Sequence, residues 1–104
     1  MEYTFKDNEI YVMNDDGSYQ IHTTFPLFEE GVVNIDHTFV TPALRGTGEA
    51  SNMMHAVINH IKSMNLKVVA TCPYAVVWLK RHQEYDEMIR HDLMEHLGEE
   101  CKIM

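Results

Sequence analysis

The stretch Arg45-Gly46-Thr47-Gly48-Glu49-Ala50 decides how this chain folds, because it joins a run typical of a β-strand, residues 32–40, to a run typical of an α-helix, residues 50–64. A glycine-rich turn at the start of a helix leaves backbone N–H groups without partners, and the helix dipole adds partial positive charge there. Arg45 adds a fixed cation with a planar set of donors. The stretch therefore predicts a phosphate-binding site.

Short apolar runs before this loop predict antiparallel strands. Residues 3–5 and 10–13 have the composition of two short strands, and Asn14-Asp15-Asp16-Gly17 is a strong hairpin signal. Residues 19–27 then alternate between apolar and polar side chains, as a half-buried strand does. The same alternation over residues 32–40 predicts one face made of Val33, Ile35, His37 and Phe39. We expect these strands to form an antiparallel meander.

After the loop the apolar period changes to that of a helix. The predicted stripe over residues 50–64 consists of Ala50, Met53, Met54, Val57, Ile58, Ile61 and Met64. Residues 67–71 follow as a buried strand, and a helical crossover of this length predicts that they pair parallel to residues 32–40. Pro73 opens a second helix that runs to about His82. A third amphipathic stretch, residues 88–97, ends at Gly98.

These patterns predict one α+β domain over residues 1–104, with a mostly antiparallel sheet whose last strands are parallel and with helices packed against it. The net charge of -8 repels nucleic acid and anionic lipid, so neither is an expected partner. The chain also lacks a long apolar run and a targeting signal, which predicts a cytoplasmic location without a membrane contact.

Histidine and cysteine spacing argues against a metal site. Each of the pairs His55 and His60, and His91 and His96, is five residues apart, so its members point about 140° away from each other on a helix. No His pair stands at the i, i+4 spacing that zinc sites on helices use, and we expect no bound metal. The two cysteines have no Cys-x-x-Cys spacing, which disfavours a disulfide scaffold.

Three kinds of phosphate loop carry such glycines. A P-loop requires a Lys-Ser/Thr pair directly after its last glycine, and Glu49-Ala50 stands there instead. A Rossmann site requires a short turn between strand and helix and an acidic residue at the end of the next strand. Here the turn over residues 40–46 is long, and the next strand ends at Cys72, so this type fits poorly.

The third kind rests on a family resemblance. Arg45-x-x-Gly48-x-Ala50, preceded by His37-Thr38-x-Val40 and followed by Cys72-Pro73-Tyr74, resembles the acetyl-CoA loop and flanking motifs of the GNAT acetyltransferase superfamily. Over residues 3–85 the chain resembles a minimal, single-domain, YjdJ-type branch of it. The resemblance implies a GNAT-like sheet with a splayed parallel strand pair. It also implies acetyl transfer from acetyl-CoA to an amine of a small molecule, a protein lysine or a protein N-terminus.

The resemblance also implies where coenzyme A binds. The pyrophosphate would lie on the loop's backbone N–H groups, the pantetheine arm would run beside residues 36–40, and the thioester would lie near Cys72. The implied cofactor-binding residues are Thr38, Phe39, Val40, Arg45, Gly46, Thr47, Gly48, Glu49, Ala50 and Ser51. Residues 86–104 lie outside the resemblance, and we interpret them as an added helical tail for packing or for a homodimer.

Cys72 is the candidate nucleophile. It closes a strand and precedes a helix that begins at Pro73, and the positive end of that helix favours a thiolate able to attack a thioester. The acyl-enzyme would then pass its acetyl group to an amine. The competing interpretation is a buried structural cysteine, which is common because cysteine is among the most buried residue types.

His37 is the candidate base, because histidine transfers protons near neutral pH. Its alternation with apolar neighbours favours a core histidine bonded to backbone instead. Larger GNAT enzymes use a tyrosine on the second helix as the acid, but here only Tyr74, in the first turn, is near, and we expect it to pack or to make a surface hydrogen bond. This departure favours the Cys72 route over direct transfer.

A second function stays open from the sequence. The chain places only a few residues before its first hairpin, whereas larger GNAT enzymes shape the acceptor pocket with additional N-terminal helices. A non-catalytic acyl-CoA-binding or interaction module would keep the loop without the chemistry. The sequence leaves the acceptor unspecified in either case.

Overall fold

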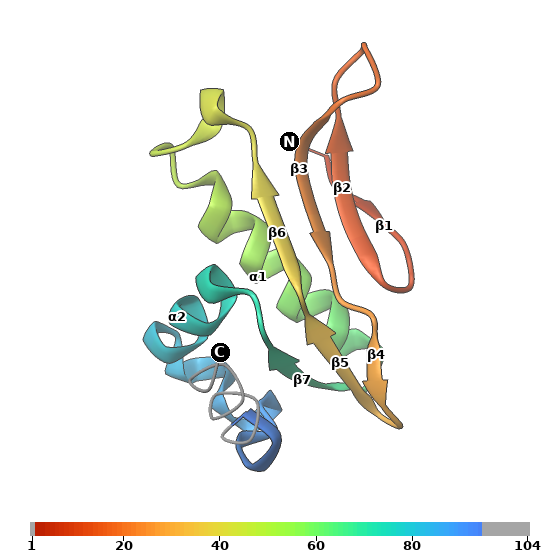
Figure 1. The fold of residues 1–104 in the computed structure, drawn as a ribbon, viewed down its shortest axis with the longest axis vertical. Coiled ribbons are helices and arrows are strands. Elements are labelled where there is room, and N and C mark those ends of the chain that lie inside the picture. Colours follow the sequence, from red (N-terminus) through yellow and green to blue (C-terminus); the bar gives the residue numbers. More distant parts are fainter. Residues whose placement is uncertain (1, 95–104) are drawn as a thin grey trace, which may run out of the picture.

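The computed structural model describes residues 2–94 as a bent β-layer with helices packed on it (Figure 1). The strands are β1 (Thr4–Phe5), β2 (Glu9–Met13), β3 (Tyr19–Thr24), β4 (Leu27–Glu29), β5 (Val32–Ile35), β6 (His37–Val40) and β7 (Lys67–Ala70). The helices are α1 (Glu49–Ser63) and α2 (Pro73–Arg81), with short 3-10 helices η1 (Pro42–Leu44) and η2 (Gln83–Met88). This α+β architecture is the predicted fold class.

The strands form two sheets rather than one continuous sheet. The first has the order β1-β2-β3-β6 and is antiparallel throughout, and the second has the order β4-β5-β7. In the second sheet β5 and β7 run parallel, with Val33 opposite Val68 and Ile35 opposite Ala70. The predicted parallel pairing across the helical crossover is therefore confirmed, although only residues 32–35 take part.

The chain crosses between the sheets at a bulge. Between the β3–β6 pairs and the β4–β5 pairs, residues 25–26 oppose residues 34–36, so one strand carries an extra residue. Pro26 has no N–H to donate to a ladder, and the Asp36 N–H turns to the carbonyl of Thr24 at 3.3 Å. The predicted continuous strands over residues 19–27 and 32–40 are therefore wrong, because each is divided here.

The extra residue changes which side chains face the core. Val33 and Ile35 are fully buried before the bulge, whereas after it Val40 is buried and His37 is exposed. Strand side chains alternate with a period of two, so one inserted residue reverses their direction. The prediction that His37 shares a face with Val33 and Ile35 is wrong for this reason, and so is its predicted place in the core.

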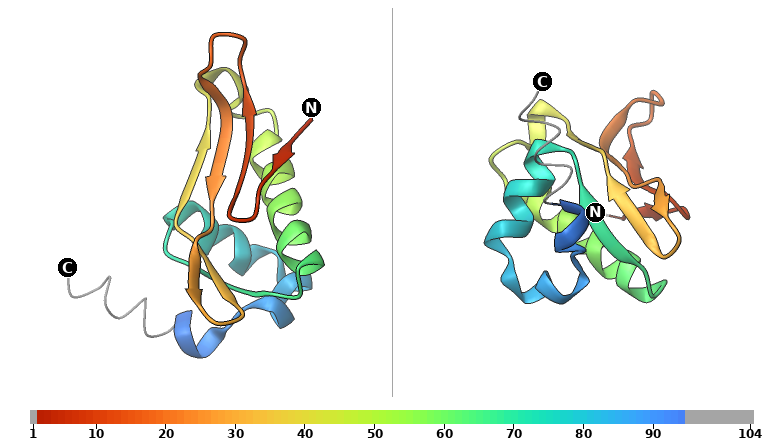
Figure 2. Two further views of the ribbon diagram at one scale, coloured as in Figure 1. Left: turned by 90° about the vertical axis from the view of Figure 1, so that its right-hand side faces the viewer. Right: turned by 60° about the horizontal axis from the view of Figure 1, so that its bottom comes forward.

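Helix α1 supplies the largest part of the core. It contacts β3, β6, β7 and α2, and the left view of Figure 2 shows it lying along one face of the first sheet. Five residues of the predicted stripe are fully buried, which confirms that stripe: Met53, Met54, Val57, Ile58 and Ile61. Trp78 is 4% exposed and packs into the same core.

The beginning of the C-terminal tail packs beside β7. Ile89 forms a parallel bridge with Val68, and the Ala70 N–H donates to the sulfur of Met94 at 3.0 Å. The predicted helix over residues 88–97 does not begin where expected, because Met88 ends η2 and a helix starts only at residue 91. The rest of the predicted tail, including Gly98, lies outside the described residues.

Candidate active site

The glycine loop connects β6 to α1 through η1 and an exposed turn. Gly46 has a φ of 83° and Gly48 a φ of 87°, a region that side chains with a Cβ rarely adopt. Gly48 is the N-cap of α1, and its carbonyl accepts the first helical bond, from the Asn52 N–H at 3.1 Å. The two glycines thus allow the chain to reverse and enter the helix.

The first turn of α1 has no side-chain cap. The Thr47 hydroxyl is used within the turn, where it donates to the carbonyl of Leu44 and lies 3.4 Å from the Glu49 N–H. Helical N–H groups at the following positions, Ala50 and Ser51, have no carbonyl one turn before them. They point out of the helix end, where the dipole favours an anion.

Arg45 is fixed against the end of β6. Its Nε donates to the carbonyl of Val40 at 3.2 Å. Within residues 2–94, no carboxylate lies within salt-bridge distance of its guanidinium. The remaining guanidinium nitrogens therefore offer a positioned cation beside the uncapped helix end.

Glu49, the first residue of α1, is held by its own chain. The Tyr3 hydroxyl donates to one carboxylate oxygen at 3.2 Å, and the Asn52 amide donates to the other at 3.4 Å. Burial and the adjacent Glu49 charge raise the pKa of Tyr3 to about 12. These contacts tie the N-terminal segment to the loop and fix the direction of an acidic side chain at its edge.

Strand β6 has one paired edge and one free edge. It pairs only with β3 in the described sheet, and just beyond it the Thr41 N–H donates to Gln20 on the β3 side at 2.8 Å. Main-chain groups alternate in direction along an antiparallel strand. Those of Thr38 and Val40 therefore point to the free edge, whereas those of Phe39 point to β3.

The parallel pair separates immediately after β5 and β7. The N–H groups of Thr71 and Cys72 both donate to the carbonyl of Ile35, at 3.1 and 3.2 Å, and close the ladder there. The side chains of Asn34 and Thr71 also bond to each other, at 3.2 and 3.3 Å. Beyond this clamp β6 follows β3 while the other chain enters α2, so the predicted splayed pair is confirmed (Figure 1).

Cys72 lies at the point of separation. It is the N-cap of α2, with Pro73 as the first helical residue, and it is 9% exposed. Its sulfur is 3.2 Å from the Thr38 hydroxyl oxygen, a contact in which either atom can donate. The thiol therefore meets a hydroxyl group, a helix N-terminus and the free edge of β6 in one place.

His37 and Tyr74 do not join this arrangement. His37 faces the opposite side of β6 from Thr38, where its ring centroid is 5.4 Å from that of His22. Tyr74 is 39% exposed, so of its two predicted roles core packing is wrong and a surface hydrogen bond stays a prediction; partial burial raises its pKa. The structure thus brings Thr38, rather than His37, to the sulfur of Cys72.

Two contacts of the site were not predicted from the sequence. One is the Thr38–Cys72 pair, and the other is a hydrogen bond from the Trp78 indole N–H to the Ser51 hydroxyl at 3.0 Å. The second bond connects α2 to the first turn of α1. Both join residues that are distant in sequence, so no local pattern signals them.

Comparisons with known proteins bear on the family and the fold of the chain. Residues 9–88 match the model of a family described as GCN5-related N-acetyl-transferase. The fold is similar to an NMR solution structure from Staphylococcus aureus, described as a GCN5-like candidate N-acetyltransferase, with a TM-score of 0.71. The two chains are 28% identical, and the match covers 85% of this chain and 86% of the other. No curated protein matches the sequence. Within residues 2–94, no helix has the length and apolar character needed to cross a bilayer.

Proposed function

Because the chain belongs to the GCN5-related N-acetyltransferase family, we propose that it transfers an acetyl group from acetyl-CoA to an amine. The observation that carries this proposal is the free edge of β6, which runs from the Arg45 anchor to the Cys72 sulfur. One end offers donors for an anion and the other a nucleophile. An extended arm between a pyrophosphate and a thioester has that layout.

Coenzyme A would bind along this edge. Its pyrophosphate would accept hydrogen bonds from backbone N–H groups over residues 46–51 and from Arg45, a combination suited to phosphate. The side chains of Thr47, Glu49 and Ser51 already have partners, so they hold the turn while the main chain binds. The pantetheine amides would pair with main-chain groups of Thr38 and Val40, as an added strand does.

The chemical step would use the Cys72 sulfur. It attacks the thioester carbonyl, forms a new sulfur–acetyl bond and releases coenzyme A, and the proton lost by Cys72 ends on the coenzyme A sulfur. The Thr38 hydroxyl, at 3.2 Å, is placed to donate a hydrogen bond to the thiolate. The start of α2 adds favourable charge.

A second transfer would complete the reaction. A neutral amine attacks the acetyl carbonyl on Cys72, the carbon–sulfur bond breaks, and the amide nitrogen gives a proton back to the thiolate. The acceptor would be a small-molecule amine, a protein lysine or a protein N-terminus. Its reactive nitrogen must reach the place where β6 and α2 separate.

A non-catalytic acyl-CoA-binding module is the second candidate. The observation that favours it is the direction of His37, which faces away from the Cys72 sulfur and so does not serve it directly as a base. Such a module would bind coenzyme A through the same loop and leave the thiol unmodified.

Intact-mass spectrometry separates the two candidates. Incubation with acetyl-CoA should add one acetyl group to the wild-type chain and to Cys101→Ser, which retains Cys72, but none to Cys72→Ala. Thermal stabilisation by coenzyme A should remain in all three proteins. Stabilisation without acetylation, and without coenzyme A release on addition of amines, would establish the binding module. If coenzyme A stabilises none of them, both candidates are wrong.

A further inference from the structure

The outer face of the first sheet carries a row of ring side chains. We define the outer face as the side of β2, β3 and β6 away from α1, with the rings of Tyr11, Tyr19, His22, His37 and Phe39. The rings of Tyr19 and His22 are stacked with centroids 4.1 Å apart, and those of Tyr11 and Tyr19 meet edge to face at 5.8 Å. No described helix covers this face (Figure 2).

Carboxylates end this row at the bulge. Glu9 lies opposite Thr24, and its carboxylate is 2.9 Å from the His22 ring nitrogen. Asp36 accepts a hydrogen bond from the Thr24 hydroxyl at 2.5 Å. Each carboxylate has further lone pairs that can accept donors from a ligand.

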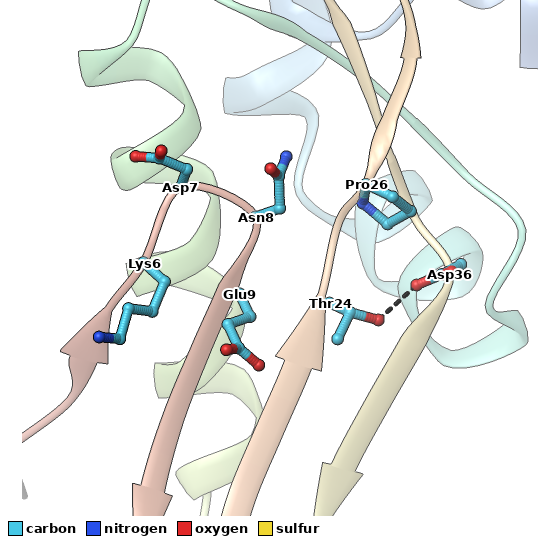
Figure 3. A pocket seen from close by; sticks show the side chains of 7 residues that line it. All are labelled: Lys6, Asp7, Asn8, Glu9, Thr24, Pro26 and Asp36. Atoms are coloured by element: carbon cyan, nitrogen blue, oxygen red, sulfur yellow. Dashed lines mark hydrogen bonds between the residues drawn. The ribbon is translucent and has the colours of Figure 1, made fainter.

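An open pocket of about 550 Å³ lies at this end of the face. Glu9, Thr24 and Asp36 line its floor beside the β1–β2 turn, where Asp7 adds a third carboxylate and Lys6 an opposing charge (Figure 3). Its volume is in the range of small-molecule sites, roughly 300–1,000 Å³. The surface therefore combines ring faces, negative charge and room for a compact ligand.

We propose that the outer face binds a small aliphatic polyamine, which serves as the acetyl acceptor. Ring faces attract ammonium groups, and the carboxylates complement their charge, as does the net charge of -8. The strands β2 and β3 are paired on both edges, so this face offers no backbone ladder for a peptide. Recognition must come from side chains, which suits a flexible cation.

A polyamine has two amines, one for the carboxylates of the pocket and one to accept the acetyl group. One ammonium group is held at Glu9 and Asp36, while a distal amine extends along the rings to β6. There His37 and Phe39 lie on the opposite side of β6 from Thr38, whose hydroxyl contacts the Cys72 sulfur, so the amine must pass through the opening where β6 and α2 separate to reach the thiol. The role as acceptor rests on the proposed acetyl transfer, whereas binding of the cation to this face does not.

Spermidine is the probe for this proposal. Calorimetry should show that Glu9→Gln/Asp36→Asn weakens spermidine binding about tenfold, and that Tyr19→Leu weakens it about threefold. The matched control Glu84→Gln/Glu87→Gln removes the same charge from exposed positions of η2 and should leave binding unchanged. In steady-state acetylation of spermidine the first variant should raise KM at unchanged kcat.

Equal spermidine affinities of the two double variants would overturn the proposal. The proposal would also be wrong if the protein does not bind spermidine but binds a lysine-containing peptide through the same two carboxylates. Thermal stabilisation by coenzyme A and acetylation of Cys72 are measured on every variant. If both responses persist while outer-face variants bind spermidine as tightly as wild type, this inference fails and the proposed acetyl transfer stands. Loss of both responses in the wild-type protein would contradict the transfer itself.

Discussion

The two helices of the site begin in opposite surroundings. Neither α1 nor α2 has a side-chain cap, so both present unpaired N–H groups and the positive end of a helix dipole. The start of α1 follows an exposed glycine turn, whereas the start of α2 follows Cys72, which is 9% exposed against the Thr38 hydroxyl. The positive N-terminus is thus exposed to solvent in α1 and enclosed in α2.

This difference separates binding from chemistry. Under the proposed function, the exposed turn would admit a bulky, hydrated pyrophosphate, whose affinity would depend on backbone approach and on Arg45. The enclosed thiol would admit only the end of a pantetheine arm that lies along β6. Variants at the first helix start should therefore change affinity, and variants at the second should change rate.

The largest effect is expected from Gly48→Val. Its φ of 87° disfavours a side chain, and a β-branched one would also stand where the pyrophosphate approaches. Coenzyme A affinity, measured by calorimetry, should fall by at least about tenfold. Gly17→Val is the matched control, because Gly17 has a φ of 88° in a distant hairpin turn and should leave affinity unchanged. Equal losses in both variants would exclude the loop as the binding site.

Replacement of Arg45 should give the next largest change. Arg45→Gln removes the positioned cation and should weaken coenzyme A binding about fivefold at low salt. The dependence of affinity on salt should also become shallower. Arg81→Gln at the exposed end of α2 removes the same charge and should behave like wild type. Identical salt dependence of the two variants would contradict a direct role for Arg45.

Much of the fold was predictable from local pattern. The stripe of α1 and the hairpin at Gly17 follow from spacing and turn chemistry, and the parallel pair follows from the length of its crossover. The bulge was not, because one extra residue opposite Pro26 becomes visible only when two strands are aligned. Because the bulge was missed, the unbroken alternation wrongly placed the His37 side chain in the core.

The candidate site was predictable as a set of motifs, not as a set of contacts. The loop and Cys72 could be found because glycines, Pro73 and helix starts have sequence signals. The Thr38–Cys72 contact and the Trp78–Ser51 bond join residues that only the fold brings together. The predicted role of Thr38 in binding the cofactor stays a prediction, and the fold adds a contact between its hydroxyl and the Cys72 thiol.

Thr38→Val tests the second helix start. The change preserves shape and β-branching but removes the hydroxyl beside the Cys72 sulfur. Acetylation of Cys72, followed by intact mass over time, should slow about fivefold while coenzyme A affinity stays the same. Thr38→Ser restores the hydroxyl and should recover most of the rate. A Val variant as fast as wild type would show that this contact is only packing.

The smallest effect concerns the side chain that touches the start of α1. Tyr3 donates to Glu49, and its pKa is raised to about 12. The neutral hydroxyl therefore stabilises the fold below pH 10, and this contribution is lost as the pH rises from about 10 toward 12, where a phenolate would face the Glu49 carboxylate. Tyr3→Phe should lower the free energy of unfolding by up to about 1 kcal/mol at neutral pH.

The difference between Tyr3→Phe and wild type should shrink and then reverse as the pH rises, when thermal unfolding is followed from pH 8 to pH 12. Tyr74→Phe is the counterpart at the start of α2, where burial alone raises the pKa and the residue is 39% exposed. Its difference from wild type should remain smaller at each pH. If Tyr3→Phe and Tyr74→Phe follow the same curve, the Glu49 contact does not distinguish the two helix starts.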